Sequence, residues 1–595
     1  MTKRLTRAFL AAFLAPILVG AATATDYFVD SQNGDDLAAG TSPETAWRTL
    51  GRVSDAKELQ GGDVVKFKKG CVWRDGLQPR SGEVDKPIIY TSYGEGEKPS
   101  FWRSTSLADP AFWTKEGENL WATRPRETRV LGPATLAIDI GKWGMHNEGD
   151  AKTKTSIEDG TYRIEVLHAG TAPNHIQWTY APFAVENGKQ WRLSFEARAN
   201  KPANYSVSFM KSGAPWTSYG VTNGKTEIGE EFARYELDTT FLKTAEDGRV
   251  TFYFGKLEEG TVLEFKNFKV EEIEIDELLL TPDVGNIILD GNKAAFKKWT
   301  RDELTTQDDF MYDREDGRVW YYSEKNPAEA HETLEAARMI HVINLSGVKD
   351  AIFHDLDLRY GAAHGFGGSG NQRCVIQNCD ISWIGGGDQY LEGAKGRRTR
   401  FGNGIEFWSD AQDHKVIGNR IWEVYDAALT NQGSGVNVER NIVYAGNLIW
   451  NCEYSFEYWN RGPESKTQDI FFAGNACLDA GYGWGHVQRR DPNGRCLMIY
   501  SNEAQTTNFQ IVGNYFVNAT DSLVRNDKEW TPEEPMMESN IYWQDDESKP
   551  YALWHGKTYS GDEFDAYRQT IDGEKRGEKR KITREYIRER FPLPE

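Results

Sequence analysis

Two short stretches of the sequence repeat an acidic residue and a tryptophan at the same spacing. GIEFW places Glu406 two residues before Trp408, and SFEYW places Glu457 two residues before Trp459. Strand side chains alternate between two faces, so if the apolar residues between them point inward, each acid points outward with its tryptophan. A carboxyl group beside an indole combines a proton-transfer group with a stacking surface for sugars. The alternative is that these glutamates are simply solvated surface residues.

A third carboxyl group lies between the two pairs. The turn VYDAALTNQG supplies Asp426 and Gln432. If the stretches are consecutive strands of one sheet, Glu406 and Glu457 are roughly 10 Å apart and Asp426 about 5 Å from either, because neighbouring strands are ~4.8 Å apart. The longer distance approaches the geometry of inverting glycosidases and the shorter matches that of retaining ones. Both geometries remain open.

Polar residues that suit a catalytic cleft also gather in three Gly-rich turns. GAAHGFGGSG supplies His364, and GWGHVQRRDPNGR supplies His486 and Arg489. WIGGGDQYLEGAKGRRTRFGNG supplies Asp388 and Arg400, although such a basic run is often only a solvated surface. We expect catalysis from one set of residues, namely Glu406, Asp426, Glu457, His364 and His486. We expect substrate contacts from another set, namely Trp408, Trp459, Arg489, Asp388, Arg400 and Gln432.

A repeat between residues 340 and 525 would bring these residues together. Five short β-type runs carry Asn at one fixed place: CVIQNCDIS, KVIGNRIWEV, VYAGNLIWNC, FFAGNACLDAG and IVGNYFVNA. These asparagines are Asn378, Asn419, Asn447, Asn475 and Asn514, and Asp355 takes the place one turn earlier. An Asn amide has donors and acceptors, so it can bond to the same residue on the turns above and below. The repeat predicts a stack of strand-turn units with an asparagine ladder.

This pattern resembles the right-handed parallel β-helix proteins of the pectin-lyase-like superfamily. The resemblance implies an all-β fold and a secreted carbohydrate-active enzyme, but not a particular reaction, because that superfamily holds lyases, glycosidases, esterases and epimerases. We expect an N-terminal cap and first β-helix turns in residues 25–129, and the main β-helix with the active cleft in residues 276–550. QDDFMYDREDGRVWYYSEKNP would add further turns, and residues 551–595 would form a charged C-terminal tail.

Residues 130–275 interrupt the repeat with alternating strands such as YRIEVLH, QWRLSFEARA and RVTFYFGK, as in an antiparallel β-sandwich. They resemble a jelly-roll carbohydrate-binding module of the family four and nine type. The resemblance implies four sugar-stacking residues, Trp143, Trp178, Tyr180 and Trp216. The alternative is an inert spacer.

The N-terminus and the composition indicate where the chain acts. Residues 1–24 have three basic residues, an apolar run and a small-residue cleavage site, which predicts a signal peptide and a secreted or periplasmic protein. A net charge of -20 argues against nucleic acid and anionic membranes as partners, and we expect a monomer without a membrane span. The six cysteines are expected as buried thiols, with a disulfide as the alternative.

Three functions compete. A glycoside hydrolase would use the paired carboxyl groups. A polysaccharide lyase would use His364 or His486 with an arginine or a bound cation, and a non-catalytic glycan-binding protein would use neither. The sequence favours the hydrolase, because it lacks the repeated Asp array of calcium-dependent pectate lyases. No cofactor is expected, with a structural or catalytic Ca²⁺ as the open alternative.

Overall fold

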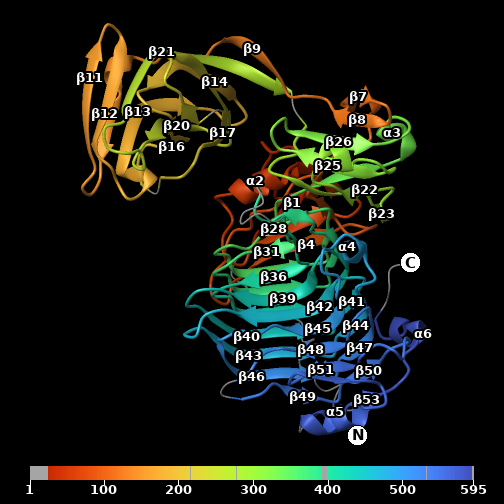
Figure 1. Cartoon of the computed structure of the whole chain (residues 1–595). Helices are drawn as coiled ribbons and strands as arrows, with labels where there is room; N and C mark the ends of the chain where they lie inside the picture. The colour runs from red at the N-terminus through yellow and green to blue at the C-terminus, as the bar shows by residue number, and fades with distance from the viewer. Residues whose placement is uncertain are drawn as a thin grey trace. The chain divides into compact units, whose positions relative to one another are not determined.

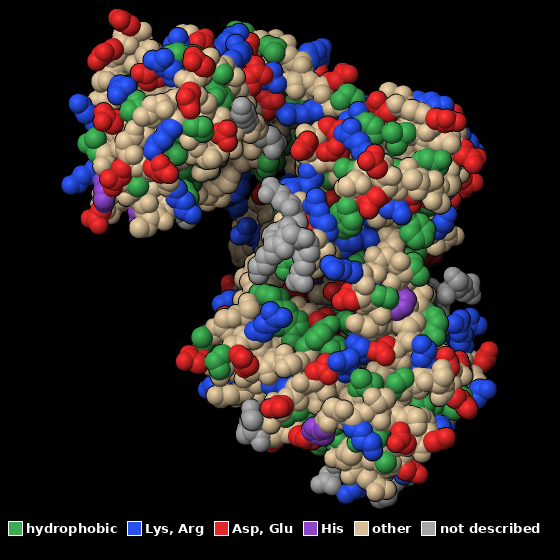
Figure 2. All heavy atoms as spheres, in the orientation of Figure 1, with side chains coloured by type: hydrophobic (Ala, Val, Ile, Leu, Met, Phe, Trp, Pro, Cys, Tyr) green, Lys and Arg blue, Asp and Glu red, His purple; other side chains and the backbone are tan. Residues whose placement is uncertain are grey.

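The computed structural model describes residues 24–214, 216–224, 226–276, 278–391, 398–530, 533–571 and 573–591. The predicted signal peptide lies outside these residues, apart from Ala24. The chain forms two compact units: one contains the residues up to Arg124 and from Leu279 onward, and the other contains Pro125–Leu278. Figure 2 shows acidic and basic side chains interspersed over the visible face, so the negative net charge is not gathered in one patch there.

The first unit is all-β and is dominated by three parallel sheets, which we call sheets I, II and III (Figure 1). From β29 to β51 the chain adds strands to the sheets in repeated order, so strands far apart in sequence become neighbours. Sheet I contains β1 (Asp26–Val29), β2 (Val64–Lys68), β4 (Ile88–Tyr93), β29 (Lys349–His354), β32 (Gln372–Gln377), β37 (Gln412–Ile417), β40 (Val438–Ala445), β43 (Lys466–Ala473), β46 (Gln505–Val512) and β49 (Met536–Glu538).

Each turn of the chain contributes one strand to each sheet, and its second and third strands form the other two parallel sheets. Sheet II contains β3 (Val72–Trp73), β5 (Ser100–Trp102), β30 (Asp357–Arg359), β33 (Asp380–Ile384), β38 (Arg420–Val424), β41 (Leu448–Trp450), β44 (Ala476–Ala480), β47 (Tyr515–Ala519), β50 (Ile541–Trp543) and β53 (Glu578–Lys579). Sheet III contains β28 (Ile343–Asn344), β31 (Phe366–Gly367), β36 (Ile405–Trp408), β39 (Ala427–Gly433), β42 (Tyr454–Asn460), β45 (Arg495–Ile499), β48 (Val524–Asn526), β51 (Ala552–Trp554) and the antiparallel β52 (Lys557–Tyr559).

Inward-facing side chains of the three sheets form one hydrophobic core. In sheet III, Ile405, Leu429, Phe456 and Leu497 stand in register on neighbouring strands and are fully buried. The six cysteines are buried and unpaired, as expected. Near the N-terminus, the short helix α2 (Leu50–Asp55) buries Leu50 and Val53.

A column of asparagines lies in the turns before the sheet II strands. The backbone N–H of Asn419 donates to Asn447 Oδ1 at 2.9 Å, and Asn447 N–H donates to Asn475 Oδ1 at 3.0 Å. The column continues through Asn514 to Asn540. The predicted ladder is therefore confirmed for Asn419, Asn447, Asn475 and Asn514, and the sequence repeat missed Asn540.

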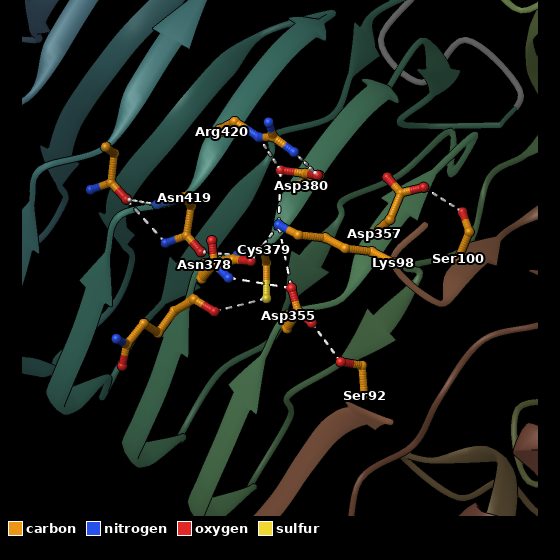
Figure 3. A network of polar contacts seen from close by, with 12 residues as sticks. Ser92, Lys98, Ser100, Asp355, Asp357, Asn378, Cys379, Asp380, Asn419 and Arg420 are labelled. Carbon is orange, nitrogen blue, oxygen red and sulfur yellow. Dashed lines mark hydrogen bonds and ion pairs between the residues drawn. The ribbon is translucent and has the colours of Figure 1, made fainter. Parts of the chain in front are cut away.

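The prediction was wrong by one residue at the start of the ladder (Figure 3). Cys379, not Asn378, donates its backbone N–H to Asn419 Oδ1 at 2.9 Å. Asn378 precedes the ladder position and has φ 52°, and Asp355 has φ 57° and accepts from Asn378 Nδ2. The equivalent residues in later turns are Gly418, Gly446, Gly474 and Gly513, with φ between 63° and 66°. Asn and Asp tolerate this left-handed conformation, so here they replace Gly and do not join the ladder.

Residues near 300 do not add turns to the parallel stack, contrary to the prediction. Within QDDFMYDREDGRVWYY, β25 and β26 form an antiparallel hairpin, with Gly317 at φ 70° in its turn. The hairpin belongs to a sheet of β24 (Phe296–Lys297), β25 (Asp309–Asp313), β26 (Arg318–Tyr322), β8 (Leu120–Thr123) and β7 (Trp113–Gly117). A second mainly antiparallel sheet contains β23 (Lys293–Ala294), β22 (Val284–Leu289), β27 (Leu334–Arg338) and β6 (Ser104–Ser106).

The second unit contains two principal antiparallel sheets around its own core. One sheet contains β10 (Gly144–Asn147), β13 (Ile176–Val185), β20 (Ala245–Tyr253) and β16 (Ser206–Lys211). The other contains β11 (Lys152–Glu158), β12 (Thr161–His168), β21 (Val262–Asp276), β14 (Gln190–Ala199), β19 (Ala233–Phe241) and β17 (Gly220–Gly224), with β9 (Glu127–Pro133) paired to β21. Because Glu127 pairs with Asp276, the unit begins and ends on adjacent strands.

Short helices complete the fold. Near the C-terminus, α5 (Phe564–Thr570) and α6 (Arg584–Arg588) pack apolar side chains against the stack, including Phe564 and Ile587. Two further helical turns are α3 (Pro327–Ala330) and α4 (Trp484–Val487). In the part of the chain that the structure describes, no helix combines the length and apolar character needed to cross a membrane.

Candidate active site

Sheet III places two of the predicted acids in one column. Its register aligns Glu406 of β36 with Thr430 of β39, and Thr430 with Glu457 of β42. Their neighbours Ile405 and Phe456 lie in the core, so strand alternation places both acids on the opposite face. Both acids are nevertheless covered, with exposures of 7% and 5%, and they are not solvated surface residues. Since two strand spacings separate them, their Cα atoms lie roughly 10 Å apart.

Asp426 lies beside this column and not within it. The sequence predicted Asp426 between the two glutamates, but the register gives that place to Thr430. Asp426 directly precedes β39, and its carbonyl accepts the backbone N–H of Glu453 at 3.1 Å. The turns have unequal lengths, so the sequence spacing could not fix this register. The correction leaves Asp426 next to Glu453, an acid that the sequence analysis did not select.

Glu406 is held by a histidine and an asparagine. His364 Nε2 lies 2.5 Å from Glu406 Oε2, and Asn403 Nδ2 donates to the same oxygen at 3.0 Å. The backbone N–H of Asn403 donates to His364 Nδ1 at 2.9 Å, which leaves the Nε2 proton for Glu406. Burial favours the neutral acid, but the contacts with His364 and Asn403 outweigh it and lower the pKa of Glu406. This carboxylate is therefore ionised at neutral pH.

A second polar cluster surrounds Asp426. Arg489 Nη1 donates to Asp426 Oδ1 at 2.9 Å, and its Nε lies 3.7 Å from Glu453 Oε1. His486, on α4, places Nδ1 2.9 Å from Glu453 Oε2. Burial raises the pKa of Asp426, and the charge of Arg489 opposes that rise. The cluster brings together the predicted residues Asp426, Arg489 and His486, with Glu453 as the connecting acid.

Glu457 has the opposite electrostatic environment to Glu406. Burial raises its pKa well above the ordinary value, and the negative charges of Asp426 and Glu406 raise it further. Arg489 opposes these effects only in part. These effects favour the protonated form of Glu457, the form that a general acid requires.

Thr430 lies between the two glutamates and was not selected as a site residue from the sequence. Its side chain is fully buried, and Oγ1 has no hydrogen-bond partner within the described ranges. A buried hydroxyl without a partner is costly to the folded state. Only the register of sheet III, which the sequence did not provide, identifies this hydroxyl as part of the column.

The predicted tryptophans form a second column of the same face. Trp408 aligns with Gln432, and Gln432 aligns with Trp459. The two indole rings meet edge to face with centroids 5.3 Å apart, and Arg461 lies over Trp459 at 4.7 Å. Both rings remain partly exposed. In each of these strands the tryptophan follows the acid by two residues, so an aromatic surface lies beside the two acids.

Two predicted substrate contacts are engaged within the protein. Arg400 donates to the carbonyls of Gly386 and Gly285 at 2.8 Å each, and to Gln488 Oε1 at 2.8 Å. Asp388 is 2% exposed and accepts from Arg398 at 2.7 Å. Arg400 would lose these contacts if it bound a glycan, so it supports the turns around the site. Asp388 has one oxygen paired with Arg398, and its Oδ1 has no partner among the described residues.

The inserted unit also differs from the sequence prediction. Trp143, Trp178 and Tyr180 lie in its hydrophobic core, with exposures of 5%, 0% and 7%. Trp143 stacks on Trp178 with ring centroids 4.1 Å apart. The prediction that these rings stack on sugars is wrong, because a strand pattern does not show which face is covered. Trp216 is 51% exposed, and Arg249 lies 4.7 Å from its ring.

No family model matches the chain. A lacto-N-biosidase from Bifidobacterium longum subsp. longum is 36% identical over 78 residues, which are 12% of this chain and only 5% of that protein. A solved glycoside hydrolase is 9% identical and covers 88% of this chain and 94% of its own, with a TM-score of 0.37. A CBM4 structure is 22% identical and covers 22% of this chain and 86% of its own, with a TM-score of 0.20. Similarity at this level leaves the reaction to be argued from the site.

Proposed function

We propose that this chain is a glycoside hydrolase in which Glu457 is the general acid and Glu406 is the general base. The observation that carries the proposal is the column of two buried carboxyl groups whose pKa values shift in opposite directions. Paired acid and base groups with separated pKa values are what glycoside hydrolysis requires.

The proposed reaction is a single displacement. Glu457 gives its proton to the glycosidic oxygen as the bond to the anomeric carbon breaks. Glu406 takes a proton from a water molecule that attacks the opposite side of that carbon. The unpaired hydroxyl of Thr430 lies between the two acids and would hold the water or a sugar hydroxyl. The two acids lie two strands apart, with Cα atoms roughly 10 Å from each other; carboxyl groups that keep a comparable separation leave room for the attacking water of an inverting reaction.

The same contacts argue against the lyase alternative. A lyase needs a free base and a group that neutralises the uronate carboxylate. His364 and His486 are each paired with a glutamate, and Arg489 is paired with Asp426 and lies near Glu453. His364 has both ring nitrogens engaged and Arg489 is held by Asp426, so a lyase would have to rely on His486, which is paired through Nδ1.

The experiment is a panel of plant-wall and algal polysaccharides, assayed for reducing ends and for the ultraviolet absorbance of unsaturated products. The proposal expects reducing ends without that absorbance, and product of inverted anomeric configuration by NMR at early times. Unsaturated products would overturn it in favour of the lyase.

The proposal includes the wider setting of the site. We infer that sheets I, II and III are the faces of a right-handed parallel β-helix, which the repeated strand order and the asparagine ladder support. The inserted unit would be a jelly-roll module that holds glycan through Trp216. The enzyme would act as a secreted or periplasmic monomer on a polysaccharide.

A further inference from the structure

Two arginines and a histidine lie close to His364, the residue that contacts Glu406. His364, which contacts Glu406, stacks on His341 with ring centroids 4.9 Å apart. His341 follows Arg338 by three residues, and the backbone N–H of Arg338 donates to the carbonyl of Arg103 at 3.0 Å. Arg338 is also bridged to Gly361, in the turn that carries His364. The group is therefore connected to Glu406 through the stacked pair His341 and His364.

This group has too few acceptors for its donors. Across the described part of the chain, the Arg338 guanidinium has no hydrogen bond and no ion pair, and its Nε is buried. Arg103 is paired with Asp75, whose side chain is 54% exposed, while Arg103 Nε is buried and unpaired. His341 Nδ1 also has no partner among the described residues; burial and then His364 lower the pKa of His341 to about 4, so this imidazole is neutral and adds a polar group but no charge. Buried donors without acceptors are uncommon and indicate a missing ligand or water.

The pKa of Arg338 agrees with this shortage of acceptors. Burial and then the charge of Arg103 lower the pKa of Arg338 to about 10, and Asp75 only partly compensates. The surface carboxylate of Asp75 pairs with Arg103 and acts on Arg338 only through its charge. An arginine that lacks its carboxylate is suited to bind one from a ligand, because its planar donors match carboxylate and sulfate oxygens.

Gly367 lies directly against both imidazoles. A side chain at Gly367, which aligns with Glu406's column through β31, would place its Cβ 2.9 Å from His341 Nδ1 and 3.0 Å from His364 Cβ. Glycine at this position lets the two imidazoles stack between the acid and the arginines. The two arginines are therefore connected to the carboxyl column through the contacts of His341 and His364.

We propose that Arg103, Arg338 and His341 form a subsite for an anionic group, the carboxylate of a uronic acid or a sulfate ester, on a sugar next to the cleaved bond. The inference rests on the proposed function only for placing that anion on a glycan. It deepens the function by assigning an acidic glycan as the substrate class.

The test measures binding to the full chain carrying Glu457→Gln, which prevents turnover in the proposed mechanism. The probes are uronic-acid oligosaccharides, the same oligosaccharides after reduction of their carboxyl groups to alcohols, and sulfated neutral oligosaccharides. We expect a charged set to bind at least ~10-fold more tightly than the reduced set, because the loss of one hydrogen bond to a charged group lowers affinity by about that factor. The charged set that binds identifies the anion as carboxylate or sulfate.

Arg338→Gln in the same chain should abolish that preference, and Arg338→Lys should retain part of it. Arg440→Gln, at an exposed arginine of β40, is the matched control and should keep it. If Arg338→Gln does not fold, Arg103→Gln replaces it. Equal binding of charged and reduced sugars, or a preference that survives Arg338→Gln, would overturn the proposal. A preference that depends on Arg338 in a protein without hydrolase activity would support the subsite and reject only the proposed function.

Discussion

Glu406 and Glu457 carry the same functional group, and their neighbours give them different chemistry. Glu406 receives two hydrogen bonds within 3.0 Å, from His364 and Asn403. Glu457 is buried near Asp426, and its negative form is disfavoured. The pairing GIEFW and SFEYW identified both acids in the sequence, but only the structure separates their roles.

The first prediction is that His364 sets the pH dependence of catalysis. His364 lowers the pKa of Glu406, and the reaction needs Glu406 ionised. His364→Gln should therefore raise that pKa and move the acid limb of the pH–rate profile to higher pH. The measurement is kcat/KM against pH, with His354→Gln on sheet I as the control. An acid limb that stays in place, or moves to lower pH, would contradict the assigned role.

At the scale of the elements, the asparagine ladder should be a main source of stability. Asn447 is fully buried and bonds to Asn419, Asn475 and the carbonyl of Val416. Asn447→Ala would leave these partners unsatisfied, so we expect a loss of about 3 kcal/mol or more. Denaturant unfolding measures it. Asn378→Gly is the contrasting variant, because its φ of 52° suits glycine and it lies outside the ladder; equal losses in both variants would contradict the account.

The last asparagine of the ladder is capped by an acid. Asn540 Nδ2 donates to Glu574 Oε2 at 2.8 Å, and burial raises the pKa of Glu574 to about 7. Because the folded pKa lies above the unfolded one, the folded state binds the extra proton between about pH 4.5 and 7, and stability falls as pH rises through that window. Glu574→Gln should weaken this dependence by up to about 3 kcal/mol. A variant with the wild-type pH dependence of unfolding would exclude Glu574 as its source.

The elements show which features the sequence could predict. Asn419, Asn447 and Asn475 recur at equal spacing, so the ladder and the parallel strands were predictable. The register of Asp426 was not, because the loops between turns differ in length. The hairpin of β25 and β26 did have a sequence signal, because Asp316-Gly317 lies between two alternating runs and such a dipeptide favours a hairpin turn; the prediction of further parallel turns overlooked it. The burial of Trp143 and Trp178 was also hidden, since aromatic residues suit both a core and a binding face.

For the whole molecule, the inserted unit should be separable from catalysis. Glu127 and Asp276 are paired on adjacent strands, so the unit can be replaced by a short linker without spanning a gap. We expect the shortened chain to cleave soluble oligosaccharides at the wild-type rate and an insoluble polysaccharide at a reduced rate. Trp216→Ala in the full chain should likewise slow cleavage of the insoluble polysaccharide and leave cleavage of soluble oligosaccharides unchanged. Loss of cleavage of soluble substrates by a folded shortened chain would show that the unit contributes to the active site.

The most direct test of the central claim compares Glu457→Gln with Glu406→Gln on two substrates of the same glycan. One is the natural oligosaccharide, and the other carries an activated aryl leaving group that needs no protonation. We expect Glu457→Gln to lose at least ~100-fold on the oligosaccharide and little on the aryl glycoside, while Glu406→Gln loses activity on both. Near wild-type turnover of the oligosaccharide by either folded variant would contradict the proposed carboxyl pair.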